Sequence, residues 1–174
     1  MRIKQNPSPK IWITALCLTF AAVLHAQTPD PTLPPASAHA ILTLRATGSQ
    51  IYACEQTNNT YTWTFVAPVA RLFDESNNEV ATHGDGPTWT FQDDTSIHGT
   101  VLQKSPSPEP NAIPWLLLKA TTPTGSGIAA KVDFIRRSDT QGGIAPTTGC
   151  DADHLDANAR VPYTATYTFY SAKP

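Results

Sequence analysis

Alternation of apolar and polar residues is the feature that most constrains how this chain can fold. In VPYTATYTFY, residues 161–170, side chains such as Tyr163 and Phe169 alternate with threonines. Successive side chains of a β-strand point to opposite faces, so this pattern predicts a strand with one buried face. TYTWTF at residues 60–65 and IAAKVDFIRR at residues 128–137 alternate in the same way.

The phase of each alternation also predicts which side chains are buried. We expect Trp63 to share a buried face with Tyr61 and Phe65, and Phe134 to point inward together with Val132. The segment IPWLLLKA, residues 113–120, is continuously apolar. It is typical of a central strand covered on both faces, and we expect Trp115 in the core.

Turn-forming segments separate these candidate strands, and no segment shows a convincing helical stripe. Asparagine, glycine and proline clusters recur between them, for example PTGSG and DTQGGIAP. Short strands with frequent turns predict an all-β fold, an antiparallel β-sandwich or barrel. The pattern alone does not choose between these two.

The first 26 residues have the features of a signal peptide. Arg2, Lys4 and Lys10 precede an apolar run of about 14 residues, and the small residue Ala26 offers a cleavage point. The run is shorter than the roughly 20 residues that span a bilayer. We expect a secreted or periplasmic protein with no membrane span after cleavage, the alternative being an uncleaved N-terminal anchor.

The rest of the chain predicts a spacer followed by one domain. Residues 27–40 are rich in proline and predict an extended, mobile spacer, so residues 41–174 form the expected single β domain. Without the three signal cations, 9 Lys and Arg remain against 14 Asp and Glu, a formal charge of −5. This balance argues against nucleic-acid binding and against adhesion to anionic lipid.

Two cysteines remain after removal of Cys17 with the signal. Cys54 and Cys150 lie 96 residues apart, and in an exported chain they predict one disulfide. A redox or metal-binding pair is the less favoured alternative, because there is no C-x-x-C and two separated cysteines make a poor zinc site. We expect no metal and no cofactor.

The most distinctive local sequence is ATHGDGPTWTF, residues 81–91. Asp85-Gly86 favours a tight hairpin turn, but the following proline predicts a wider loop over residues 84–87. A rigid loop beside His83 and Trp89 suits the wall of a pocket, or else a plain connection between strands. Histidine and aspartate here offer hydrogen bonds or acid–base chemistry to a ligand.

A pair of arginines offers a further candidate. Arg136 and Arg137 end a strand, and one of them must point away from the Phe134 side, where it could anchor an anionic group. A salt bridge to Asp133 or Asp139 is the alternative. The predicted ligand-binding set is therefore His83, Asp85, Trp89 and Arg137.

Several motifs together resemble a secreted family known as domain of unknown function 3455. They are GSQIYAC (48–54), HGDGPTW (83–89), IPWLLLKA (113–120), IRRSDTQGGIAP (135–146), the Gly149-Cys150 pair and the closing VPYTATYTFY. The resemblance covers most of residues 48–170 in order. It implies the compartment and the fold, but the family name carries no activity.

Three functions are compatible with these features. The preferred hypothesis is an exported, non-enzymatic β module that binds a small molecule or glycan near His83, Asp85 and Trp89. The second is a secreted hydrolase that uses His83 and Asp85 as an acid–base pair. The third is an envelope protein with a structural or interaction role and no small ligand.

Overall fold

The computed structural model describes residues 29–172, and it is built almost entirely of β-strands, as predicted. The expected signal peptide, residues 1–26, lies outside the described residues. The strands are β1 (His39–Thr57), β2 (Thr60–Phe73), β3 (Glu79–Gly84), β4 (Thr88–Phe91), β5 (Ser96–Ser105), β6 (Trp115–Thr124), β7 (Phe134–Gly142) and β8 (Asn158–Ser171). Two short 3-10 helices, η1 (Ile128–Lys131) and η2 (Ala152–His154), interrupt the connections on either side of β7.

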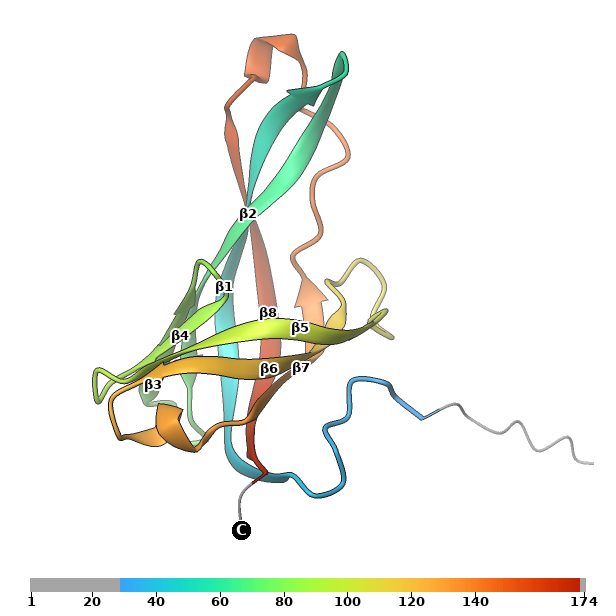
Figure 1. Cartoon of the computed structure of the whole chain (residues 1–174). Coiled ribbons are helices and arrows are strands. Elements are labelled where there is room, and N and C mark those ends of the chain that lie inside the picture. Colours follow the sequence, from blue (N-terminus) through green and yellow to red (C-terminus); the bar gives the residue numbers. More distant parts are fainter. Residues whose placement is uncertain (1–28, 173–174) are drawn as a thin grey trace, which may run out of the picture.

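The eight strands form a closed antiparallel barrel (Figure 1). Each strand pairs with its neighbour in sequence, and β8 pairs with β1 to close the ring. The sandwich alternative is thereby excluded. In such an up-and-down barrel the connections alternate between its two ends. The β1–β2, β3–β4, β5–β6 and β7–β8 connections meet at one end, the mouth, and the remaining connections meet at the other, the floor.

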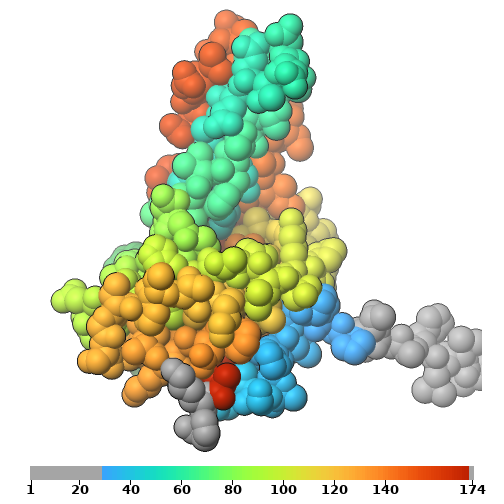
Figure 2. All heavy atoms as spheres, in the orientation of Figure 1, coloured from blue at the N-terminus to red at the C-terminus, as the bar shows by residue number. Residues whose placement is uncertain are grey.

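One part of the sheet continues beyond the mouth. Residues 51–67 of β1 and β2 pair with each other past the end of β7, and residues 143–161 run beside them. Figures 1 and 2 show these two segments rising together from the barrel, and we call them the protrusion. The predicted disulfide between Cys54 and Cys150 is confirmed, and it ties β1 to the β7–β8 connection there.

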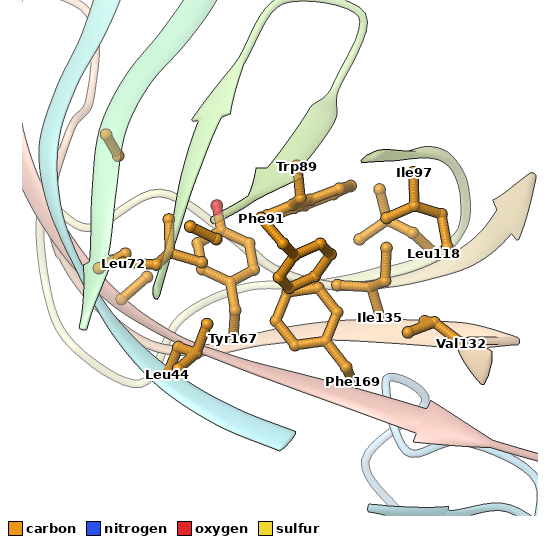
Figure 3. Packing of buried hydrophobic residues seen from close by; sticks show 14 of the residues in the cluster. Leu44, Leu72, Trp89, Phe91, Ile97, Leu118, Val132, Ile135, Tyr167 and Phe169 are labelled. Atoms are coloured by element: carbon orange, nitrogen blue, oxygen red, sulfur yellow. The ribbon is translucent and has the colours of Figure 1, made fainter. Parts of the chain in front are cut away.

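The inside of the barrel is filled by side chains at alternating strand positions. β8 shows the predicted pattern most clearly, because Tyr163, Ala165, Tyr167 and Phe169 are all buried. Phe169 packs edge-on against Phe91 with ring centroids 5.4 Å apart, and Figure 3 shows these rings inside the barrel together with Trp89. Burying each such side chain stabilises the fold by about 1.5–3 kcal/mol, so this aromatic cluster is a major part of the core.

The predicted burial of Trp63 is wrong, because the residue lies in the protrusion beyond the barrel interior. Trp63 does share its sheet face with the buried Cys54, its partner on β1, and with Phe65, which is 51% exposed and lines the mouth. A β-bulge at Val66, between the pairs Ile51–Ala67 and Tyr52–Phe65, separates this alternation from that of the buried residues further along β2. Trp63 is half-buried in the protrusion, where its Nε1 donates to the carbonyl of Thr148 at 2.9 Å.

The apolar segment around β6 is covered on both faces at its centre, and less so than predicted at its ends. Leu118 points into the barrel core and the adjacent Leu117 is buried on the opposite face. Trp115, which the pattern placed in the core, lies half-buried on the outer face instead. The guanidinium of Arg136 stacks over its ring at 4.9 Å.

The expected inward face of residues 128–137 is only partly correct. Residues 128–131 form η1 instead of extending β7, so the strand alternation starts at Phe134. Val132 is buried as expected and Ile135 faces the core, but Phe134 is only half-buried, with Lys119 Nζ 4.4 Å from its ring centroid.

The proline-rich segment before β1 lies against the barrel wall. Asp30 forms an ion pair of 2.7 Å with Arg136, whose Nε also donates to Thr32 Oγ1 at 3.3 Å. Thr32 is completely buried. Partial burial opposes ionisation of Asp30, but hydrogen bonds from Thr32 and Arg136 outweigh it and lower the pKa of this carboxyl. Residues 29–38 are therefore attached to the barrel, unlike the mobile spacer that their composition predicts.

Candidate binding cavity at the barrel mouth

A cavity of about 560 Å³ occupies the mouth half of the barrel. All eight strands contribute to its lining, together with the β3–β4 turn and the end of the β5–β6 connection. Most of the wall is apolar and includes Phe65, Val66, Val101, Ile113, Leu116 and Leu118. A volume of this size is in the range of about 300–1,000 Å³ found for small-molecule sites, which in barrels lie at the mouth.

The four residues predicted from the sequence all line this cavity. His83 is the penultimate residue of β3, Asp85 lies in the β3–β4 turn, Trp89 follows on β4 and Arg137 comes from β7. The turn itself has three residues between the paired Gly84 and Thr88, and is thus wider than a tight hairpin, as predicted. Gly86 adopts a φ of +80° there, which residues with a side chain rarely adopt.

His83 and Trp89 form a stacked pair inside the barrel. They are direct partners on β3 and β4, and their rings are nearly parallel, 4.3 Å apart. Trp89 is only 1% exposed. A Cβ at Gly99 would lie 2.9 Å from the Trp89 ring, so glycine at this position makes room for the indole. Trp89 is thus a wall of the cavity and part of the core at once.

The protonation state of His83 follows from its surroundings. Burial lowers the pKa of His83 to about 4, although its hydrogen bond with a carbonyl oxygen opposes this shift. The imidazole is therefore neutral at neutral pH. Its Nδ1 lies 2.9 Å from the carbonyl oxygen of Thr88. Because a carbonyl can only accept, Nδ1 carries the proton and Nε2 keeps its lone pair.

Asp85 does not join His83 as an acid–base pair. Its side chain is exposed at the edge of the mouth, and within the described part of the chain it forms no ion pair. The Asp85 backbone carbonyl accepts a hydrogen bond of 2.6 Å from Thr88 Oγ1, which holds the turn. The two residues therefore line the same cavity without the contact that proton transfer between them would need.

The two adjacent arginines point to opposite sides of the barrel wall. Arg136 faces outward to Asp30, whereas Arg137 faces the cavity. Arg137 donates from Nε and Nη2 to the carbonyl oxygen of Pro114 at 3.1 and 2.9 Å. Neither arginine pairs with Asp133 or Asp139, the alternative that the sequence left open.

Three buried polar atoms in the lining have no hydrogen-bond partner in the protein. They are Gln50 Nε2, Trp89 Nε1 and the Tyr167 hydroxyl, on side chains that are at most 2% exposed. The hydroxyl of Tyr167 points toward the end of the barrel that carries the β3–β4 turn (Figure 3). Buried donors are normally paired, and leaving one unpaired costs about 1–3 kcal/mol. A ligand with an acceptor atom would satisfy the donors of Gln50 and Trp89. The Tyr167 hydroxyl also lies near that of Tyr163, whose pKa is raised by burial and further by Tyr167.

Sequence reasoning missed several lining residues, notably Gln50, Lys104 and Tyr167. A signal existed for Gln50, because in GSQIYAC it shares the face of Tyr52 and Cys54, which both lie inside. A polar residue at an inward strand position suggests a cavity. Tyr52 donates to the carbonyl of Gly143 at 2.6 Å, and burial raises the pKa of its hydroxyl.

Metal binding finds no support in the part of the chain that the structure covers. No three histidine, cysteine or acidic side chains among residues 29–172 come together to hold an ion. His98 is exposed on the outer wall, where its Nδ1 lies 3.0 Å from Thr88 Oγ1. Among the same residues, no helix has the length and hydropathy that a membrane crossing requires.

The fold and the site together define a closed, eight-stranded up-and-down β-barrel with a cavity at one end. The chain belongs to the family described as Protein of unknown function (DUF3455), whose model matches residues 35–171. This confirms the family resemblance noted in the sequence. No curated protein and no solved structure matches the chain significantly.

Proposed function

We propose that this protein is an exported, non-enzymatic barrel that binds one small, largely apolar molecule in the cavity at its mouth. The observation that carries the proposal is the combination of an apolar wall with three buried donors that have no partner in the protein, on Gln50, Trp89 and Tyr167. The apolar wall would bury the body of the ligand, and the donors would fix the position of its polar group.

Between the two ligand classes that the sequence suggests, the geometry favours an apolar molecule over a glycan. Sugars stack on an exposed aromatic face. Trp89 is buried, and His83 covers one face of its indole while Tyr167 and Phe169 approach the ring edge-on. Most of the remaining wall is aliphatic or phenylalanine, and its polar side chains include Gln50, Lys104 and Arg137.

The hydrolase alternative has less support from the same geometry. His83 Nδ1 is bonded to a backbone carbonyl, and the carboxylate of Asp85 stays in solvent at the rim. A purely structural role would leave the three unpaired donors without a purpose. The disulfide supports export, because such bonds persist in oxidising compartments.

Neighbouring residues on β5 offer a matched test of binding. Val101 lines the cavity, whereas the equally exposed Leu102 does not, at 50% and 47% exposure. Val101→Trp should narrow the mouth and weaken binding of 1-aminoanthracene, a neutral apolar fluorophore, by about tenfold, equivalent to about 1.4 kcal/mol. Leu102→Trp should leave its affinity unchanged.

Fluorescence titration measures both affinities. If the wild-type protein binds neither 1-aminoanthracene nor decan-1-ol saturably, the proposal is refuted. So would equal weakening by the two substitutions, because the fluorophore would then lie outside the cavity.

A further inference from the structure

The cavity contains a charge that the protein does not neutralise. Arg137 is half-buried at an inward-facing position of β7 and lines the cavity. Among the described residues, no carboxylate lies within ion-pair distance of its guanidinium. Its hydrogen bonds go to one neutral acceptor, the carbonyl of Pro114. Arginine has five N–H donors, so donors remain for a ligand.

The other polar groups of the lining also favour a negatively charged ligand. Gln50 Nε2 and Trp89 Nε1 can only donate, and the hydroxyl of Tyr167 can donate as well. Lys104 adds a second cation at the exposed edge. The lining has one carboxylate, Asp85, which lies in solvent at the rim.

The charge of Arg137 acts across the interior. Burial is the main cause of the lowered pKa of His83 and of the raised pKa of Tyr52 and Tyr163; the charge of Arg137 adds to the first shift and opposes the other two. These residues lie on three different strands, β3, β1 and β8. The mouth half of the barrel is therefore a region of positive potential with an apolar wall.

If the proposed binding function holds, we propose that the ligand is a monocarboxylic acid bound as its anion. Its carboxylate would pair with Arg137 and accept from the unpaired donors, while its hydrocarbon part would lie against the aliphatic wall. The planar guanidinium fork suits a carboxylate, which it can bind through two parallel hydrogen bonds. One half-buried cation in an apolar cavity balances one negative charge, which favours a monocarboxylate over a doubly charged phosphate.

The same chain with three different head groups tests this inference. Decanoate, decan-1-ol and decyltrimethylammonium compete for the cavity against 1-aminoanthracene at neutral pH. Wild-type protein should bind decanoate at least about tenfold more tightly than decan-1-ol, a difference of about 1.4 kcal/mol, and should bind the cation most weakly. If wild-type protein binds decanoate and decyltrimethylammonium equally tightly, this result overturns the inference without any variant.

Substitution of the arginine assigns the selectivity to one residue. Arg137→Gln should weaken decanoate binding by at least about tenfold and so remove its preference over decan-1-ol. Arg137→Lys keeps the charge but not the fork, and should retain part of the preference. Arg136→Gln is the matched control, because this neighbour faces Asp30 on the outer wall.

The possible results separate this inference from the proposed function. If the protein binds decan-1-ol as tightly as decanoate, the proposal that the ligand is a carboxylate is overturned, but the proposed binding function stands. Absence of binding by all three compounds and by the fluorophore would remove the binding function itself. Equal loss of decanoate and decan-1-ol in Arg137→Gln and Arg137→Lys would show that Arg137 only holds the loop at Pro114, which also contradicts the inference.

Discussion

His83 shows what a single residue contributes when a polar ring is placed inside a barrel. It is 4% exposed, stacks on Trp89 and has a pKa of about 4, lowered by burial. The unfolded chain has an ordinary histidine with a pKa near 6.5. Between these two values the unfolded state binds a proton that the folded state does not. The free energy of unfolding must therefore fall as the pH falls from about 6.5 to 4.

The first prediction concerns this pH dependence. The contribution of His83 should decrease the free energy of unfolding by about 3 kcal/mol across this window, and should be constant above it. Urea unfolding of His83→Gln should show a smaller loss between pH 7 and pH 4.5 than wild type does. Carboxylates titrate in the same range in both proteins, so the difference between the two curves isolates the histidine.

His98→Gln is the control for this experiment. His98 is exposed on the outer wall, and its replacement should leave the wild-type pH dependence in place. If His83→Gln and wild type lose the same free energy on acidification, the imidazole is not buried in the neutral form.

At the scale of elements, the segment before β1 behaves as part of the barrel wall. The Asp30–Arg136 ion pair is partly buried, with side-chain exposures of 25% and 15%, and Arg136 also stacks over Trp115 on β6. We expect Asp30→Asn to release residues 29–38, with faster amide hydrogen exchange there and a changed Trp115 environment. The cost in global stability should be only about 1 kcal/mol, because partial exposure screens the pair.

Hydrogen exchange measured by mass spectrometry checks this second prediction. Arg71→Gln is a suitable control, because it breaks the ion pair with Glu79, where the arginine is 67% exposed. It should leave exchange in residues 29–38 unchanged. Unchanged exchange in Asp30→Asn would mean that burial of Thr32 alone holds the segment.

Regular alternation made some elements predictable and irregular backbone hid others. β8 alternates without interruption through its buried half, so its inward residues follow directly from the sequence. In β2 the bulge at Val66 breaks the period, and no residue type in TYTWTFVAPVA signals it. The short helix η1 has a similar effect before β7. Both irregularities come from local backbone choices that tertiary packing decides. Trp63 was misplaced for another reason, because alternation does not show where a strand extends past the barrel.

The candidate site was predicted in part for a related reason. His83, Asp85, Trp89 and Arg137 stood out by residue type beside a turn or a strand end, and the barrel brings all four to one cavity. Tyr167 and Gln50 lie within strands and look like core or surface positions until the barrel closes. Their role depends on which strands meet across the interior, and that arrangement cannot be read from a single strand.

The whole molecule is an asymmetric barrel. Its floor half is filled by rings such as Phe91 and Phe169, whereas its mouth half keeps a cavity of about 560 Å³. An eight-stranded barrel has an interior just wide enough to be filled by side chains or to hold one small ligand. This barrel is filled by side chains at its floor and is hollow at its mouth. The protrusion adds Tyr52, Phe65 and Val66 to the cavity wall on one side.

The disulfide acts on this whole molecule as well as on the protrusion. The loop closed by Cys54 and Cys150 has a sequence separation of 96 residues and contains β2 to β7, six of the eight strands. In the chain-entropy model, a loop of this length stabilises the fold by roughly 4–5 kcal/mol through the unfolded state. The third prediction is that Cys54→Ser/Cys150→Ser loses global stability of about this size.

Guanidinium unfolding of the double variant measures the loss as a lower midpoint for the whole barrel. Because the unconstrained unfolded chain exposes more surface, the slope of the transition should also rise slightly. If the disulfide served only to hold the protrusion, the midpoint would not move, and faster hydrogen exchange would be confined to residues 143–157. A shifted midpoint with unchanged affinity for decan-1-ol would show that the crosslink stabilises the barrel without shaping its cavity.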